Sequence, residues 1–399
     1  MKNNKNLLDT CRDYCTGCGL CGSVLNKPFH SDEKGFLYPA LEEADRDFCS
    51  DVCPAAGKAV NSYSDGTIFG KIISCRLGWA NDESLRFKAS SGGVLSAVCI
   101  YLLEHNIVDG IIQTKKDDSD LRKTVTVVSK TAQDVRDCAG SRYTASSPLM
   151  NIESLIEEGK KYAFVGKPCD VSALRMLSHS GRVEWTKQIV YMFSFFCAGQ
   201  PSIAANNKLL NALGCQSADE CLEFDYRGNG WPGYAAVVTK DGKSSKMDYE
   251  RSWMTILGRD VRRCCRFCAD GTGEQADISC GDAWYLGADG KPDFTDRPGR
   301  NVVFSRTEAG DRLLHDLTAA GCITVEPYDI EKDGLKKSQP YHYNRKASLS
   351  SLKLAMSVCR KNFPLYDSKK MKGYAKGYPI KSKTLRCIGT IKRVWSKVI

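Results

Sequence analysis

The sequence lacks several features that would place it in a broad class at once. Its longest apolar runs, at 92–103 and 189–199, are shorter than the roughly 18 residues that span a bilayer, so we expect both to be buried core. The first ten residues have no apolar stretch of the kind found in secretory signals, which predicts a cytoplasmic protein. The five histidines show no spacing typical of metal ligands.

Cysteine, in contrast, is abundant, with 20 in 399 residues. In a chain expected to stay in the reducing cytosol, this number indicates metal or redox chemistry rather than disulfides. Cys15, Cys18 and Cys21 form a C-x2-C-x2-C run. Thiols this close cannot each reach a distant disulfide partner, but they can converge on one metal centre.

Composition divides the chain into three segments. Residues 1–70 are rich in cysteine and glycine with little helical periodicity, as expected of a module organised by metal. Residues 71–345 alternate strand-like and helix-like stretches, which predicts an α/β (α+β) core domain with helices packed on a sheet. Residues 346–399 form a basic tail: from Arg345 onward there are 15 Lys or Arg and one acidic residue, in a chain of net charge +10.

Periodicity predicts individual elements of the middle segment. Helices are expected at 150–158, after Gly93 and after Pro168. Strands are expected at 107–113, 124–128, 162–165 and 189–196.

The N-terminal segment matches a ferredoxin template in part. Two-cluster ferredoxins use C-x2-C-x2-C-x3-C-P twice, and the fourth cysteine of each run binds the cluster of the other run. Here Glu43 and Arg46 stand where the second run needs cysteines, and Cys49 is spare. The pattern predicts a ferredoxin-like module that keeps one [4Fe-4S] cluster, with a four-thiolate structural zinc site as the alternative. The cluster ligands are Cys15, Cys18, Cys21 and Cys53.

A second group of thiols is spread along the middle segment. Cys265 and Cys268 form a C-x2-C pair, which by itself also suits half a zinc site or a redox pair. Cys169 and Cys197 follow the ends of two expected buried strands, where α/β folds place functional groups. Together the four would bind a second cluster, although Cys264 is an alternative to its neighbour Cys265.

Five ordered segments carry a family resemblance: SSGGVLSAV at 90–98, AGSRYTASSP at 139–148, FVGKPCDVSALR at 164–175, FFCAGQPS at 195–202 and CRFCADGTGEQADISCGDAW at 265–284. Over roughly residues 11–345 the chain resembles the coenzyme F-420 hydrogenase/dehydrogenase beta-subunit family. A stand-alone chain with its own cluster module is most similar to the members from bacterial polysaccharide gene clusters. The resemblance implies two cofactors, a [4Fe-4S] cluster on Cys169, Cys197, Cys265 and Cys268, and FAD.

Two segments are expected to contact the flavin. The first precedes a helix, whose free N–H groups and dipole favour a pyrophosphate, and Arg142 has the planar fork that clamps a phosphate. An ordinary helix cap and a surface arginine are the alternative interpretation. Asp282 is a further candidate near the flavin. The expected contacts are Ser90, Ser91, Gly92, Gly93, Gly140, Ser141, Arg142 and Tyr143.

The resemblance implies an FAD-dependent iron–sulfur oxidoreductase. It would move electrons between a two-electron donor, such as a reduced deazaflavin coenzyme, and [4Fe-4S] clusters or ferredoxin, in the service of polysaccharide synthesis. The alternative is a non-catalytic electron-transfer subunit that docks on a partner enzyme.

The basic tail has its own alternatives. Ile388, Ile391, Trp395 and Val398 fall on one helical face opposite cations, a pattern that suits peripheral contact with the inner face of an anionic membrane. A solvated tail, or docking on the near-neutral body, is the simpler expectation. No aromatic-lined groove or known motif accompanies the charge, so we expect no nucleic-acid binding.

Overall fold

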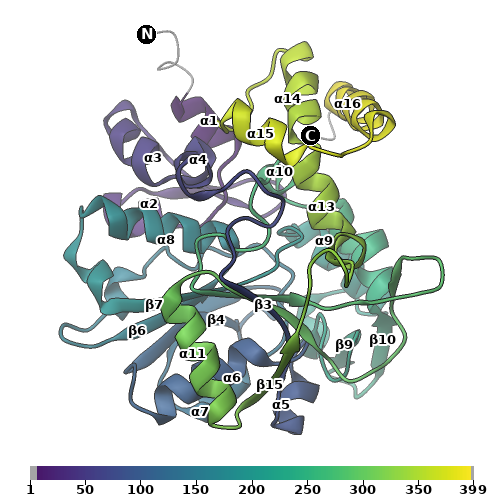
Figure 1. Cartoon of the computed structure of the whole chain (residues 1–399). Helices are drawn as coiled ribbons and strands as arrows, with labels where there is room; N and C mark the ends of the chain where they lie inside the picture. Colours follow the sequence, from purple (N-terminus) through teal and green to yellow (C-terminus); the bar gives the residue numbers. More distant parts are fainter. Residues whose placement is uncertain (1–6, 397–399) are drawn as a thin grey trace.

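An eight-stranded mixed sheet forms the centre of the computed structural model, which describes residues 7–396 (Figure 1). Its central strands β11, β7, β6 and β4 run parallel, and antiparallel strands flank them on both sides. The α/β class predicted from the sequence is confirmed. In spatial order the strands are β15 (Ile323–Pro327), β3 (Ser74–Ala80), β14 (Asn301–Ser305), β11 (Ile278–Asp282), β7 (Ile189–Phe195), β6 (Tyr162–Gly166), β4 (Gly110–Lys116) and β5 (Thr124–Ser129).

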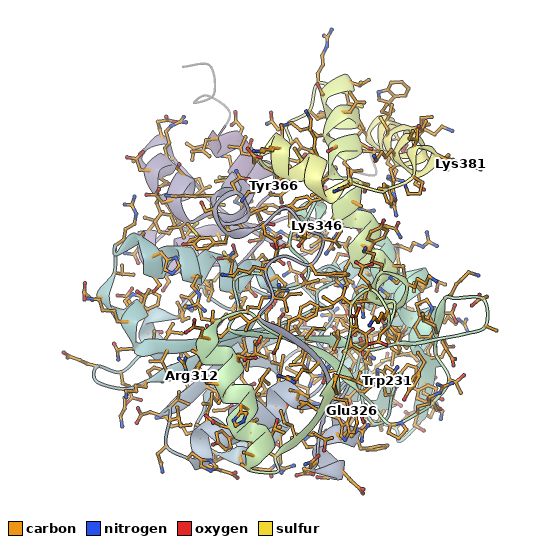
Figure 2. The ribbon with its side chains drawn as sticks, in the orientation of Figure 1. Trp231, Arg312, Glu326, Lys346, Tyr366 and Lys381 are labelled. Atoms are coloured by element: carbon orange, nitrogen blue, oxygen red, sulfur yellow. The ribbon has the colours of Figure 1, made fainter. Side chains whose placement is uncertain are left out.

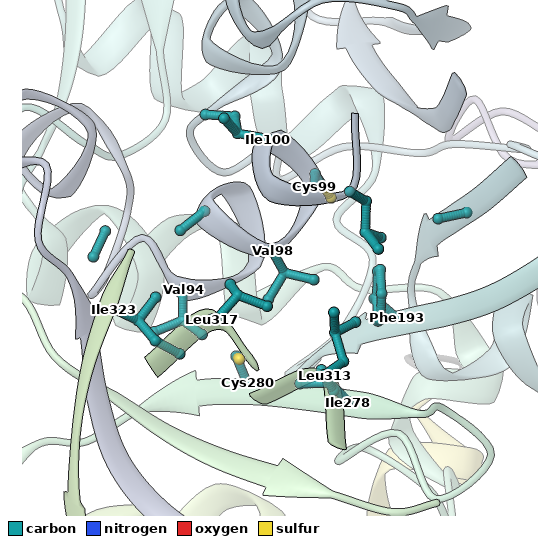
Figure 3. Close-up of a cluster of buried hydrophobic side chains, with 14 of the residues drawn as sticks. Val94, Val98, Cys99, Ile100, Phe193, Ile278, Cys280, Leu313, Leu317 and Ile323 are labelled. Atoms are coloured by element: carbon teal, nitrogen blue, oxygen red, sulfur yellow. The ribbon is translucent and has the colours of Figure 1, made fainter. Parts of the chain in front are cut away.

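Helices cover both faces of this sheet. On one face lie α6 (Val94–Glu104), α7 (Ala132–Cys138) and α11 (Glu308–Ala319), and on the other lies α8 (Pro168–Ser180) (Figure 1). Figure 3 shows the core under α6 and α11, which includes Val94, Leu317 and Phe193 of β7. The neighbouring Met192 belongs to the core under α8, because side chains alternate between the two faces of a strand.

The N-terminal segment packs on α8 as a small unit of short helices and one hairpin. Its ferredoxin-like character stays a prediction. Its elements are α1 (Leu7–Asp13), α2 (Leu20–Leu25), β1 (Phe29–Ser31), β2 (Leu37–Pro39), η2 (Glu43–Asp45), α3 (Arg46–Val52), η3 (Pro54–Ala56) and α4 (Lys58–Tyr63).

A second, three-stranded antiparallel sheet of order β10-β9-β8 stands beside the large one. Helix α9 packs on it around a separate core that includes Phe224 and Trp253. The remaining elements are α5 (Glu83–Lys88), η4 (Glu153–Leu155), η5 (Glu184–Gln188), α9 (Ile203–Ala212), η6 (Ala218–Glu220), β8 (Cys221–Asp225), β9 (Tyr234–Thr239), β10 (Ser244–Asp248), η7 (Arg251–Ile256), η8 (Leu257–Arg259), α10 (Arg263–Arg266), β12 (Tyr285–Leu286), β13 (Pro292–Asp293) and α12 (Leu335–Ser338).

Most expected elements are confirmed, with two differences. Strands β5, β6 and β7 and helices α6 and α8 lie where periodicity placed them, whereas the strand expected at 107–113 begins at Gly110. The expected helix at 150–158 is wrong, because only the turn η4 forms there. The N-terminal segment holds this backbone instead: the Leu149 N–H donates to the Cys18 carbonyl at 2.8 Å and the Glu153 N–H to Ser23 Oγ at 3.2 Å.

The C-terminal segment packs against the rest of the chain. It contains α13 (Pro340–Ala347), α14 (Leu349–Val358), α15 (Ser368–Tyr374) and α16 (Ile380–Trp395). Buried Leu352 and Met356 share one core with Tyr14 and Phe267. The tail therefore docks on the body through α14 and α15, whereas membrane contact through its last helix stays a prediction. The segment boundaries at 70/71 and 345/346 stay a prediction, and this core crosses both. Residues 1–6 and 397–399, including Val398 of the expected helical face, lie outside the described residues.

None of the helices described in residues 7–396 has both the length and the apolar composition required to cross a bilayer.

A buried ion pair provides a test of this packing. Lys346, only 4% exposed, pairs with the equally buried carboxylate of Glu274, whereas Lys381 on α16 is exposed (Figure 2). The variant Lys346→Ala leaves the Glu274 carboxylate without its cation, so we expect the free energy of unfolding in urea to fall by about 3–5 kcal/mol. The control Lys381→Ala should change it by less than about 0.5 kcal/mol. Equal effects of the two substitutions would contradict the packing described.

Candidate functional site

Five partly buried thiols line one cavity of ≈ 60 Å³ between the large sheet and the N-terminal segment. Strands β6 and β7 are adjacent and parallel, so Cys169 and Cys197, which follow their carboxyl ends, reach the same edge of the sheet. The short helix α10 and the turn after it bring the other three: Cys264, Cys265 and Cys268. We call this space the cysteine cavity. The structure thus brings together all four residues proposed as ligands of the second cluster.

The pKa values of Cys264 and Cys265 are shifted in opposite directions. Their sulfurs are 4.0 Å apart, and the hydrogen bond from Cys264 lowers the pKa of Cys265 to about 6. Burial, in contrast, raises the pKa of Cys197 to about 12 and that of Cys268 to about 11. The Gln200 N–H also donates to the Cys265 sulfur at 3.4 Å. Both members of the pair line the cavity, so the choice between them as a ligand stays open.

Fixed cations surround the cysteine cavity. Arg345 of α13 is 6% exposed and donates to the carbonyl oxygens of Cys197 at 3.1 Å and of Cys265 at 3.3 Å. Lys167 lines the cavity as well, and its ammonium lies 2.8 Å from the buried Asp170 carboxylate. Thiolates are the ligands of iron–sulfur clusters, and nearby cations stabilise their negative charge. The donor set therefore fits a [4Fe-4S] cluster.

The N-terminal thiols form a second group. The Cys11 thiol donates to Cys49 and Cys53, and this hydrogen bond lowers the pKa of Cys53. Burial raises the pKa of the other three predicted ligands, Cys15, Cys18 and Cys21, and the charge of Cys53 contributes to the increase. Cys21 and Cys53 pack on the same core as Cys11 and Cys49, and Cys18 packs with Cys21 on the neighbouring core. In residues 7–396, no three His, Cys, Asp or Glu side chains already stand at the distances of a single-ion site.

Arg262 connects the two groups of thiols. It is 1% exposed, and its guanidinium donates to the Cys15 carbonyl at 2.7 Å and the Leu37 carbonyl at 2.6 Å. The same charge faces the thiols of Cys15 and Cys264. Gly17 has a φ of +70°, and a Cβ there would lie 2.5 Å from the guanidinium, so the close approach requires glycine.

A larger cavity of ≈ 340 Å³ adjoins the cysteine cavity. Four residues line both spaces: Lys167, Cys197, Gly199 and Gln200. We call the larger space the main cavity. One part of its wall is aromatic and comes from η7 and from the loops that follow α7, β10, β11 and β13: Tyr143, Tyr249, Trp253, Trp284 and Phe294. Its size and its mixture of aromatic and polar groups are those of a cofactor site.

Seven of the eight expected flavin contacts line the main cavity, namely Ser90, Ser91, Gly93, Gly140, Ser141, Arg142 and Tyr143. Gly92 packs behind the wall, where a Cβ would lie 2.7 Å from Asn301 Oδ1. The two hydroxyls hold neighbouring loops: Ser90 Oγ accepts from the Ser141 N–H at 2.6 Å, and Ser91 Oγ donates to the Arg300 carbonyl at 3.0 Å.

Three buried polar atoms of residues that line the main cavity have no hydrogen-bond partner among the described residues: Arg142 Nε, Asp170 Oδ1 and Gln200 Oε1. Such atoms are costly unless a bound group satisfies them, so the wall fits a polar cofactor. Asp282 also lines the cavity, but its carboxylate accepts from the Arg227 guanidinium at 2.7 Å and the Trp231 indole at 2.8 Å. It therefore fixes the wall rather than offering free acceptors.

Several wall residues escaped the sequence analysis. Arg227 and Tyr249 lie in no quoted motif, and Arg345 lies at the end of the resemblance. Gln200 and Lys167 stand inside two of the quoted motifs, and their place beside the expected ligands was the available signal.

Comparison with family models matches two parts of the chain. Residues 75–153 match the N-terminal part, and residues 159–331 the C terminus, of the coenzyme F420 hydrogenase/dehydrogenase beta subunit. The chain is similar in fold to a subunit of the F420-reducing [NiFe] hydrogenase complex of Methanosarcina barkeri, with a TM-score of 0.53, 20% identity, and coverage of 74% of this chain and 97% of that one.

Curated relatives have related names. The coenzyme F420 hydrogenase subunit beta of Methanococcus voltae is 27% identical, with 70% of this chain and 92% of the relative covered. A beta subunit of F420-dependent formate dehydrogenase from Methanococcus maripaludis is 26% identical, with 71% and 66% covered. The coenzyme F420-dependent sulfite reductase of Methanocaldococcus jannaschii is 24% identical, and the chain spans about half its length, with 80% and 48% covered. None of these names refers to polysaccharide synthesis.

The predicted ligand set of the N-terminal segment includes Cys53 and leaves out Cys49, which lies one helical turn earlier in the chain. We expect Cys53→Ala to lower iron from about eight to about four atoms per chain, because it would remove a predicted ligand of one of the two predicted four-iron clusters. Cys49→Ala is the matched control, since Cys49 lies beside the same group yet is not assigned as a ligand, and it should retain about eight. Iron and sulfide assays on anaerobically purified protein measure both. Full iron in Cys53→Ala, or halved iron in Cys49→Ala, would contradict the ligand set.

Proposed function

Because the chain belongs to the coenzyme F420 hydrogenase/dehydrogenase beta-subunit family, we propose that it is an iron–sulfur flavoprotein oxidoreductase. It would pass electrons between a two-electron carrier bound at the main cavity and one-electron iron–sulfur centres. One observation supports this most: Cys197 and three neighbouring residues line the main cavity and the cysteine cavity at once.

The arrangement suits a chain of redox groups. The cysteine cavity adjoins the main cavity on one side, and on the other its wall includes Tyr14 and Pro54 of the N-terminal segment, which carries the second group of thiols. A flavin, when bound, exchanges electrons in pairs with a hydride donor and singly with a cluster. The protein contributes close placement and partial exclusion of water.

We propose FAD as the resident group of the main cavity. The backbone of Ser91 and Gly93 at the start of α6 would hold its pyrophosphate, since free N–H groups at a helix N-terminus favour anions. Arg142 would donate from its unpartnered Nε. Aromatic rings such as Trp253 and Trp284 offer apolar faces for a flat ring system.

The relatives' names suggest the two-electron carrier. Hydrogenase, formate dehydrogenase and sulfite reductase relatives are all named for coenzyme F420, so we propose the reduced deazaflavin coenzyme as donor and a ferredoxin-type protein as the one-electron partner. Service in polysaccharide synthesis has no support in these names and is not part of the proposal.

A second candidate is an electron-transfer subunit without activity of its own. The names of the hydrogenase and formate dehydrogenase relatives contain the words "subunit beta". These words favour the second candidate, because a subunit works within a complex. Both candidates share the same cofactors and differ only in whether the isolated chain turns over.

Anaerobic purification followed by assay of iron, sulfide and flavin on one sample tests the proposal. We expect about eight iron atoms and one flavin per chain, and oxidation of reduced coenzyme F420 with methyl viologen as acceptor. Turnover only after a partner is added would favour the second candidate. Colourless protein without sulfide or flavin would refute both.

Arg142→Gln tests the main cavity as the flavin site. Loss of a charged hydrogen-bond donor typically costs about 1.5–3 kcal/mol, so flavin should bind roughly ten- to a hundredfold more weakly. The control Arg136→Gln breaks an ion pair with Asp82 at a position that does not line the cavity, and it should leave the affinity unchanged. Flavin fluorescence during titration of the deflavinated protein measures both, and equal affinities would contradict the assignment.

A further inference from the structure

Helix α16 is amphipathic, but most of its large apolar side chains do not face the protein. A surface helix normally buries its apolar stripe against the core. In Ile380–Trp395 the one buried residue of the helix is Thr390, which is 1% exposed. Four large apolar side chains of the helix remain in solvent, with exposed fractions of 80% for Ile380, 62% for Leu385, 47% for Ile388 and 72% for Trp395, whereas Ile391 and Val394 are half-buried.

The side of the helix that faces the protein already has partners. α16 packs along α14 (Figure 1), and Val394 contacts the core shared with the N-terminal segment. Thr390 Oγ1 donates to the Arg386 carbonyl at 2.8 Å and accepts from Arg393 at 3.0 Å. The side of α16 that faces the protein thus has its partners within the chain. The exposed apolar side chains of α16 remain free to contact an external surface.

The charge of α16 indicates what that surface is. The helix carries five cations and no acidic residue: Lys381, Lys383, Arg386, Lys392 and Arg393. From Arg345 onward the chain has 15 Lys or Arg and one acidic residue, while residues 1–344 have 42 Lys or Arg and 46 Asp or Glu. The positive charge is therefore concentrated beside the exposed apolar residues, which suits an anionic surface.

A lipid surface fits this helix better than a protein groove does. At 100° per residue, Lys381 and Lys392 stand among the apolar residues, between Ile388 and Leu385. Lysine is depleted from the cores of protein interfaces, whereas at a membrane its long chain lies along the apolar region and carries the ammonium to the headgroups. Tryptophan, here Trp395, is likewise enriched at the membrane–water boundary.

We propose that α16 lies in the plane of an anionic lipid surface, with Ile380, Leu385, Ile388 and Trp395 at the acyl boundary and its cations among the headgroups. The family-model match ends at residue 331, so this anchor is an addition outside it. The proposal does not depend on which carrier the main cavity binds.

Co-sedimentation with vesicles tests the proposal on the full-length holoprotein. We expect binding to vesicles of phosphatidylglycerol and phosphatidylcholine, and little binding to phosphatidylcholine alone. The double variant Leu385→Gln/Ile388→Gln should weaken partitioning more than tenfold, because two apolar side chains no longer enter the boundary. Leu222→Gln on β8 is the matched control: Leu222 is 61% exposed against 62% for Leu385, and its replacement should leave binding unchanged.

The electrostatic part has its own expected result. Lys381→Gln/Lys392→Gln should weaken binding about fivefold per cation removed, and high salt should weaken it for every variant that still binds. Unchanged cofactor content and melting temperature confirm that the variants are folded. Equal binding to both vesicle types, or insensitivity to the Leu385/Ile388 change, would overturn the proposal. So would self-association that the same change abolishes in protein that ignores vesicles, since the apolar side would then join two copies of the chain.

Discussion

The parallel pairing of β6 with β7 is the constraint on which the candidate site depends. Because the two strands run side by side in the same direction, their carboxyl ends deliver Cys169 and Cys197 to one edge of the sheet. Ser194 of β7 adds a side-chain bond between the two strands, since its buried hydroxyl donates to the carbonyl of Gly166, the last residue of β6, at 3.0 Å. Helix α10 and the turn after it bring Cys264, Cys265 and Cys268 to the same place, so that the thiols line one cavity.

The site brings several cysteine thiols together in a partly buried cavity, where nearby guanidinium groups can balance the charge of thiolates. Burial raises the pKa of most of these thiols, so free thiolates would be costly there. Arg262 and Arg345 place guanidinium groups against them, and both are held by backbone carbonyl oxygens as well. Binding of iron to thiolates releases protons and is coupled to folding, so we expect cofactor assembly to stabilise the N-terminal segment.

The C-terminal segment has two roles in this arrangement. Its first helices complete the body: Arg345 reaches the cysteine cavity, Tyr366 lines it, and Met356 packs against the N-terminal segment. Its last helix, α16, contributes little apolar burial and leaves Ile380, Leu385, Ile388 and Trp395 exposed. The basic segment looks uniform in composition, but its parts differ in the structure. The first helices line the site and pack on the body, and the last helix exposes apolar side chains.

The sequence by itself determined the elements and chemistry that depend on neighbouring residues. Alternating apolar residues specify β6 and β7, the residues after Gly93 and Pro168 specify helices, and close spacing groups the cysteines at 15–21 and 265–268. The strand-end positions of Cys169 and Cys197 were predictable for the same reason, because strand ends are read from local periodicity.

Only the tertiary structure decided which distant segments meet. It placed the loop of Arg142 beside the loop before α6, Arg227 against Asp282, and Arg345 against the carbonyl oxygens of two cysteines. It also replaced the expected helix at 150–158 with a backbone held by Cys18 and Ser23. These outcomes depend on contacts between residues far apart in the chain, and local periodicity and backbone propensity carry no information about such contacts.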